Sequence, residues 1–104
     1  MQLVPLTQTP NQSFTVRLDG SRYDITIKEA RGRMVVDLVR DDVTLFQGMA
    51  AKTGTPLIPY RYLENGNFVF TTDGDVEPYF ELFNVSQQLV YLTLTEVEAL
   101  RANG

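Results

Sequence analysis

Residues 14–28 read FTVRLDGSRYDITIK, and this stretch decides the fold class. Apolar and polar side chains alternate over residues 14–18 and again over 23–28, which is the period of a strand with one buried face. Between the two runs, Asp19, Gly20 and Ser21 are turn residues, and glycine takes a positive φ at no steric cost. The stretch therefore predicts a β-hairpin.

The pattern continues along the chain. Residues 31–33 and 41–42 are of types that favour turns. Further strands are predicted over residues 34–39, 43–48, 67–71 and 88–94. Apolar side chains on both faces of 34–39 predict that both faces are partly covered. Asn65–Gly66 is typical of a type I′ turn and predicts a tight hairpin into 67–71, with 60–63 as the preceding extended segment. Residues 79–83 fit either a short strand or a helical turn.

The end of the chain carries a helix signal. Thr95 and Glu98 have the spacing of a capping box, which predicts a short helix over about residues 96–102. Taken together, the pattern is mainly β: a compact antiparallel, barrel-like domain of about six to seven strands with a short C-terminal helix. We expect one domain over residues 1–104, opening with a Pro-flanked segment over 1–13.

The amino-acid composition limits which catalytic and metal-binding sites the chain can form. The 104 residues contain no Cys and no His, which excludes disulfides, zinc–thiolate sites and Ser-His-Asp catalysis. We therefore expect no enzyme, no catalytic residue and no cofactor. The net charge is −4 and the basic residues are scattered, so nucleic acid is not an expected partner. No apolar run is long enough for a membrane span or a targeting segment, and a cytosolic product is expected.

Two segments carry candidate sites. Asp73, Asp75 and Glu77 are spaced by two residues, which fits a solvated turn and, as the alternative, a calcium site; we assign no metal there. The Pro-punctuated loop over residues 53–60 and the segment after it are predicted to bind a protein partner, because tyrosine and arginine dominate interfaces. The residues that we expect to carry this binding are Pro56, Pro59, Tyr60, Arg61 and Tyr62.

The same aromatic segment has a second interpretation. Together with Phe68 and Phe70, Tyr60 and Tyr62 fit a stacking platform for single-stranded nucleic acid in a small barrel. The net charge of −4 argues against that platform, since the basic groove is missing. A small oligonucleotide- or ligand-binding β-barrel remains the alternative function.

Several blocks of the sequence resemble the phage baseplate plug family. In order, they are PLT at 5–7, PNQSF at 10–14, LDG at 18–20, YDI at 23–25, PLIPYRYL at 56–63, GNF at 66–68 and LVYL at 89–92. The resemblance extends from residue 3 to about 94, so the predicted helix lies outside it.

The resemblance implies a small β structural protein of a contractile-tail bacteriophage or prophage. Its expected partners are the hub and tube proteins of the tail, with no membrane and no nucleic acid. It would be assembled in the bacterial cytoplasm, as a monomer or small oligomer when isolated, and would end in the baseplate of the virion tail. The family brings no catalytic residue that can be transferred to this chain.

Overall fold

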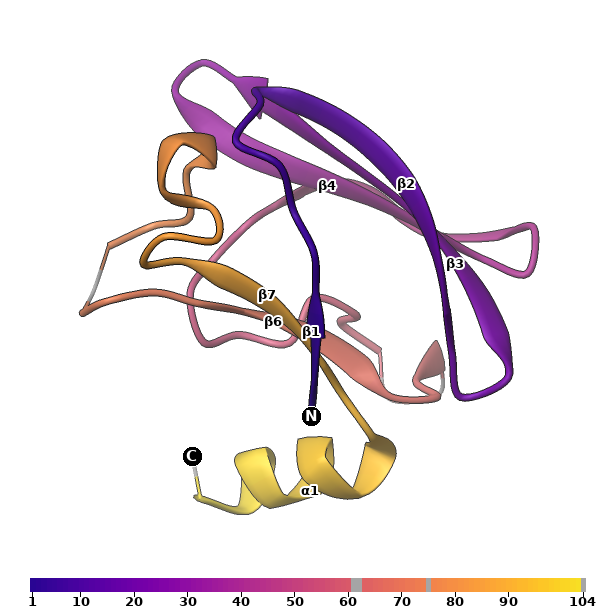
Figure 1. Cartoon of the computed structure of the whole chain (residues 1–104). Coiled ribbons are helices and arrows are strands. Elements are labelled where there is room, and N and C mark those ends of the chain that lie inside the picture. The colour runs from indigo at the N-terminus through magenta and orange to yellow at the C-terminus, as the bar shows by residue number, and fades with distance from the viewer. Residues whose placement is uncertain (61–62, 75, 104) are drawn as a thin grey trace.

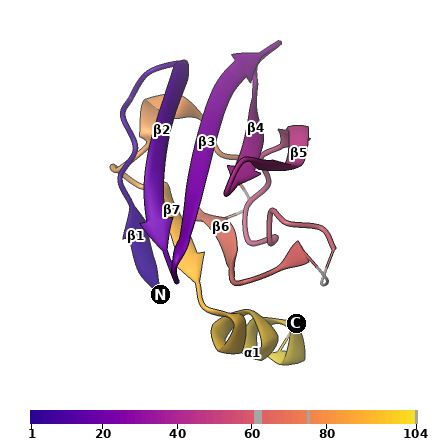
Figure 2. The same ribbon diagram turned by 90° about the vertical axis from the view of Figure 1, so that its right-hand side faces the viewer.

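The computed structural model describes residues 1–60, 63–74 and 76–103, and its strands form two antiparallel sheets (Figure 1). The larger sheet holds four strands in chain order: β2 (Asn11–Leu18), β3 (Ser21–Ala30), β4 (Arg33–Arg40) and β5 (Val43–Ala50). The smaller sheet holds three strands in the order β1 (Gln2–Val4), β7 (Gln88–Leu92) and β6 (Asn67–Thr71). Helix α1 (Leu94–Asn103) follows β7 at one end of the molecule (Figure 2). The predicted mainly β fold with a C-terminal helix is confirmed.

Two-residue turns connect the strands of the larger sheet. In each turn both central residues have a positive φ, which defines a type I′ turn, the geometry that matches the twist of paired strands. The central pairs are Asp19–Gly20, Arg31–Gly32 and Asp41–Asp42. These turns were the local signals in the sequence, so the meander that they predict forms as expected.

The core lies between the two sheets. On the larger sheet the inward side chains of β3 and β4 are buried, whereas Val35 and Val39 on the outer face of β4 are half-buried. Tyr23 of β3 meets Phe68 of β6 edge-on, with ring centroids 5.1 Å apart, and Phe68 meets Tyr91 of β7 at 5.2 Å. This aromatic group joins the sheets through apolar area and favourable ring geometry.

Strand β1 is not predicted by the sequence pattern. Its register sets Gln2 opposite Tyr91 and Val4 opposite Leu89, so it pairs with a strand at the other end of the chain. With only three residues before Pro5, β1 is too short to show a periodic pattern of apolar side chains. Residues 79–83 take the helical alternative, as the 3₁₀ helix η2 (Phe80–Leu82).

The predicted hairpin at Asn65–Gly66 is wrong. Gly66 has a φ of 106°, but Asn65 lacks the positive φ that a type I′ turn requires. Residues 61–62 of the predicted extended segment lie outside the described residues, and the Leu63 N–H donates to the Tyr60 carbonyl at 3.0 Å rather than to β6. Strand β6 instead receives hydrogen bonds on that side from the Gly54 and Leu57 N–H groups, both 2.9 Å long.

The helix begins earlier than predicted. A capping box does form, but it joins Thr93 and Glu96: the Glu96 N–H donates to Thr93 Oγ1 at 3.3 Å, and the Thr93 N–H donates to Glu96 Oε1 at 3.0 Å. The box predicted at Thr95 and Glu98 is therefore two residues too late. Both pairs have the same spacing, so the capping-box pattern by itself does not distinguish them.

Candidate functional site

A surface pocket of about 560 Å³ lies between the segment that follows β5 and the last turns of α1. We call it the loop–helix pocket; it is lined by Met49, Ala50, Lys52, residues 54–59, Leu100 and Arg101. Pro56, Leu57, Ile58 and Leu100 make most of its wall apolar, with Lys52 and Arg101 as its two cations. Its volume falls in the range of about 300–1,000 Å³ typical of ligand pockets.

Backbone contacts hold the loop wall of the pocket in place. The Gly54 and Leu57 N–H groups donate to the carbonyls of Phe70 and Phe68, so this segment runs along the free side of β6. The hydroxyls of Thr53 and Thr72 lie 2.7 Å apart and add a side-chain contact. A loop held in this way loses little conformational entropy when it binds a partner.

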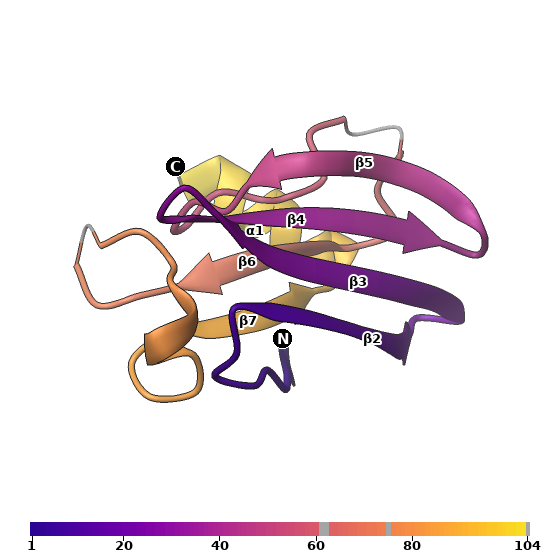
Figure 3. The ribbon, with the colours of Figure 1, turned by 90° about the horizontal axis from the view of Figure 1, so that it is seen from above.

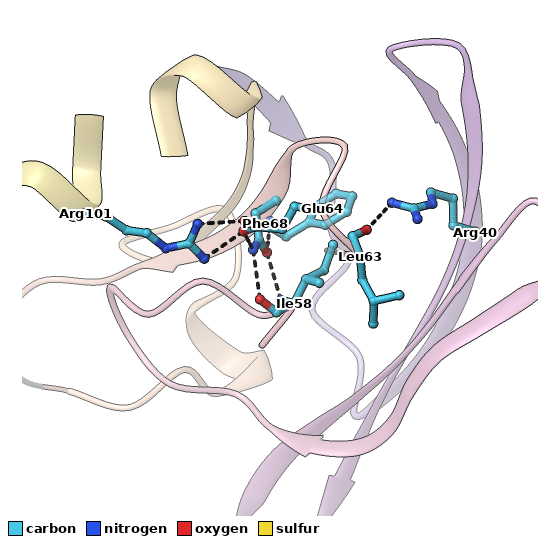
Figure 4. A network of polar contacts seen from close by, with 7 residues as sticks. Arg40, Ile58, Leu63, Glu64, Phe68 and Arg101 are labelled. Carbon is cyan, nitrogen blue, oxygen red and sulfur yellow. Dashed lines mark hydrogen bonds and ion pairs between the residues drawn. The ribbon is translucent and has the colours of Figure 1, made fainter. Parts of the chain in front are cut away.

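Asn67 links this loop to the helix. Its side-chain oxygen accepts from the Ile58 N–H at 2.8 Å, and its amide donates to the Ile58 carbonyl at 3.0 Å (Figure 4). The same amide contacts the Glu64 carboxylate. Asn67 is buried, so these bonds satisfy a side chain that burial would otherwise destabilise.

Arg101 of α1 completes the network. Its guanidinium donates to both oxygens of Glu64, at 2.6 and 2.8 Å, and the Glu64 side chain is only 1% exposed (Figure 4). The hydrogen bond that Arg101 donates to Glu64 raises the pKa of Arg101 above its ordinary value. On the other side of Glu64, Arg40 donates to the Leu63 carbonyl and joins β4 to the same segment. The helix wall of the pocket is thus attached to the loop wall through the Arg101–Glu64 ion pair and Asn67.

The structure brings part of the predicted site together. Pro56 and Pro59 line the loop–helix pocket, and Tyr60 follows them with 55% of its surface exposed. The predicted Arg61 and Tyr62 lie outside the described residues. The pocket residues Lys52, Leu100 and Arg101 are not predicted from the sequence. The sequence does place Leu100 three residues after Val97, on the next turn of the predicted helix, and Val97 is buried in the structure.

The Tyr91 hydroxyl is held by two hydrogen-bonding contacts within the fold. The Tyr91 hydroxyl lies 2.6 Å from an Asp19 carboxylate oxygen and 2.5 Å from the Asn65 carbonyl. Burial, and then the hydrogen bond with Asp19, raise the pKa of Tyr91, so this phenol stays protonated and ties two turns to β7. It is a structural contact rather than a nucleophile.

The acidic segment over residues 73–77 forms no metal-binding cluster in the part of the chain that the structure describes. There, no three acidic side chains lie close enough to hold a metal ion, and Asp75 of the predicted segment is outside that part. Among the same residues, α1 is the longest helix and falls short of what a bilayer crossing requires.

Comparison with known families gives a match over most of the chain. The family model described as cyanophage baseplate Pam3 plug gp18 matches residues 1–96. This range includes all seven strands and the start of α1, so it covers the whole sheet architecture as well as residues 52–59 of the loop–helix pocket. No curated protein matches the chain.

Proposed function

The chain belongs to the cyanophage Pam3 baseplate plug family, and from that premise we propose that it docks on the hub and tube proteins of a phage tail. The family is a structural component of the phage baseplate, and the match over residues 1–96 is the observation that carries this assignment. A structural component of an assembly needs a surface on which neighbouring proteins can bind.

The loop–helix pocket is the surface that we propose for docking. Its apolar wall is suited to take up side chains of a neighbouring protein, and the exposed Tyr60 beside it adds a rigid aromatic contact. Apolar pockets next to tyrosine are typical of the few positions that carry most of the binding energy at an interface. The hydrogen bonds of the loop to β6 support this proposal, because they hold the surface ready before the partner arrives.

The rest of the molecule would act as a rigid body. Tyr23, Phe68 and Tyr91 pack the two sheets against each other, so both sheets keep their relative position when the loop docks. In this proposal the protein performs no catalysis. It is assembled in the bacterial cytoplasm and remains in the virion baseplate. A net charge of −4 favours protein neighbours over nucleic acid.

Co-expression with the products of the flanking tail genes tests the docking proposal. Stable co-elution with a hub or tube protein is expected. Leu100→Asp, which places a charge in the apolar wall, should reduce the co-eluting fraction at least tenfold, about 1.4 kcal/mol or more.

Val43→Asp is the matched control, because Val43 is an apolar side chain that is 61% exposed at the start of β5, away from the pocket. Equal loss of binding in both variants would contradict docking at the pocket. Co-elution with no tail protein at all would contradict the proposal as a whole. Saturable binding of a small apolar ligand instead would favour the alternative of a ligand-binding β module.

A further inference from the structure

The two sheets end in four strand edges, and three of them are closed to regular pairing. The edge of β6 is covered by the hydrogen bonds of Gly54 and Leu57. Strand β5 is broken by two register shifts against β4 and by Gly48 with a φ of 66°. Strand β1 has three residues. Strand β2 remains: eight residues, paired with β3 without a register shift, at the border of its sheet (Figure 3).

The register shows which backbone groups of β2 point away from β3. The Glu29 N–H donates to the Pro10 carbonyl at 2.8 Å, so residues 10 and 29 form a hydrogen-bonded pair. Such pairs alternate along an antiparallel ladder, and the even-numbered residues of β2 therefore bond to β3. The N–H and C=O groups of Asn11, Ser13, Thr15 and Arg17 face outward. These four donors and four acceptors have no backbone partner in the described chain, and of the four carbonyls only that of Asn11 accepts a side-chain hydrogen bond there, from Thr9 Oγ1 at 3.2 Å.

Strand β2 also lacks the features with which natural proteins block an edge. It contains no proline, no lysine and no bulge, and Arg17 is its single charge. Its inward side chains Phe14 and Val16 are only half-buried, although Ile25 and Tyr23 opposite them on β3 are fully buried. A strand added along β2 would complete the hydrogen bonds and cover the exposed parts of Phe14 and Val16.

We propose that β2 pairs antiparallel with β2 of a second copy of this chain, which joins two four-stranded sheets into one continuous sheet of eight. An antiparallel edge is its own complement under a two-fold axis, because the outward donors of one copy meet the outward acceptors of the other. The inward side chains of both copies then lie on the same face of the joined sheet, so Phe14 and Val16 of one extend the apolar surface of the other.

Charge supports a second copy as the occupant. Among the two-fold registers, only the one centred on Arg17 sets like charges directly opposite each other. Pairing centred on Phe14 sets Arg17 opposite Asn11, and pairing centred on Thr15 sets it opposite Ser13. Asp24 of β3, opposite Thr15, already accepts from Thr15 Oγ1 at 2.7 Å. Two chains of net charge −4 can thus meet at an edge that carries no acidic side chain.

The assembly would stop at two copies. After β2 pairs with β2, the outer strands of the joined sheet are the two β5 strands, and their register shifts interrupt a regular edge. A two-fold contact of this kind is closed and does not propagate into a fibre. The proposal rests on β2 alone and is independent of docking at the loop–helix pocket.

Sedimentation velocity of the purified full chain tests the proposal. We expect a species of twice the 11.8 kDa chain mass that dissociates on dilution. Ser13→Lys with Thr15→Lys, and separately Ser13→Glu with Thr15→Glu, should each give monomers, because like charges then face each other. An equal mixture of the two variants should recover the dimer. Thr44→Lys with Gln47→Lys, at exposed positions of β5, is the matched control and should remain dimeric.

Amide hydrogen exchange gives a second, residue-level result. In the wild-type dimer the N–H groups of Asn11, Ser13, Thr15 and Arg17 should be protected, and in the charged variants they should exchange freely while those of β3 stay protected. A wild-type chain that is monomeric up to about 1 mM overturns the proposal, since even weak dimers form there. A dimer that survives in both charged variants, or a mixture that stays monomeric, overturns it equally, whatever the tail proteins do.

Discussion

The hydroxyl of Tyr91 occupies the space that any side chain at Gly66 would need. A Cβ placed on Gly66 would overlap that hydroxyl and lie 2.8 Å from the Leu92 carbonyl, and the φ of Gly66 is 106°. Glycine at this position therefore lets the turn before β6 close against β7, where Tyr91 also reaches Asp19 and Asn65. The two sheets meet here through contacts that leave no room for a methyl group.

Gly66→Ala should lower the free energy of unfolding by about 2–4 kcal/mol, from overpacking together with backbone strain. Urea unfolding measures it. Gly74→Ala is the matched control, because Gly74 has a φ of 72° but nothing within 4 Å of its Cβ position, so only the strain remains, about 1 kcal/mol. Equal losses in the two variants would show that Tyr91 does not restrict position 66.

Arg101→Leu should destabilise the fold more than Glu64→Gln. The first removes the Arg101 cation from a carboxylate that is 1% exposed, at a cost of about 2–4 kcal/mol, somewhat below that for a fully buried pair because Arg101 is partly exposed. The second keeps hydrogen-bonding capacity and removes the charge that needs a partner, so about 1–2 kcal/mol is expected. A double-mutant cycle by urea unfolding measures the coupling, and additive losses would argue against the pair.

Thr93→Ala should cost about 1 kcal/mol of stability, because Thr93 caps α1 through the Glu96 N–H. Thr95→Ala, two positions along, should change stability by about 0.5 kcal/mol or less, because its side chain is exposed. Thermal unfolding of the two variants compares them directly. A larger loss of stability for Thr95→Ala than for Thr93→Ala would instead support the capping box predicted at Thr95 and Glu98.

Asp37→Asn should reduce stability near neutral pH and lose its effect in acid. The Gly48 N–H, at 2.7 Å, and then the Lys28 ammonium, at 3.2 Å, hold the pKa of Asp37 below its ordinary value of 3.8. A lowered folded-state pKa stabilises the protein fully above the ordinary value, and this contribution disappears as the pH falls through the folded pKa.

The difference between the wild type and the Asp37→Asn variant should therefore be about 1 kcal/mol or less at pH 6, and should shrink towards zero near about pH 2. Unfolding by urea across that range measures it. A difference that grows in acid would mean that Asp37 is not stabilised as a carboxylate.

How well the sequence predicts each part of this fold depends on how far apart in the chain the contacting residues are. The turns at Asp19–Gly20, Arg31–Gly32 and Asp41–Asp42 follow from the conformational preferences of two neighbouring residues, and all three form as predicted. At Asn65–Gly66 the same local preference is overridden, because Asn67 bonds to Ile58 and Glu64 and holds the preceding residues against the loop and α1. Local chemistry is decisive only where no distant partner competes.

The candidate site shows the same limit. Proline and tyrosine composition was enough to single out the loop that contains Pro56, Pro59 and Tyr60. The opposite wall, Leu100 and Arg101, comes from α1, which begins more than thirty residues later, and no spacing rule links the two walls. The Glu64–Arg101 ion pair that sets their separation is a tertiary contact, visible only once the chain has folded.

The arrangement of the two sheets also sets an order of events during synthesis. Strands β2 to β5 pair only with sequence neighbours through two-residue turns, so the larger sheet can form early, while the ribosome is still adding residues. Strand β1 must wait for β7, since Val4 pairs with Leu89. Until that segment emerges, the inward faces of β3 and β4 lack their cover. We therefore expect the nascent chain to be most vulnerable to aggregation and proteolysis after β5 has emerged and before β7 has.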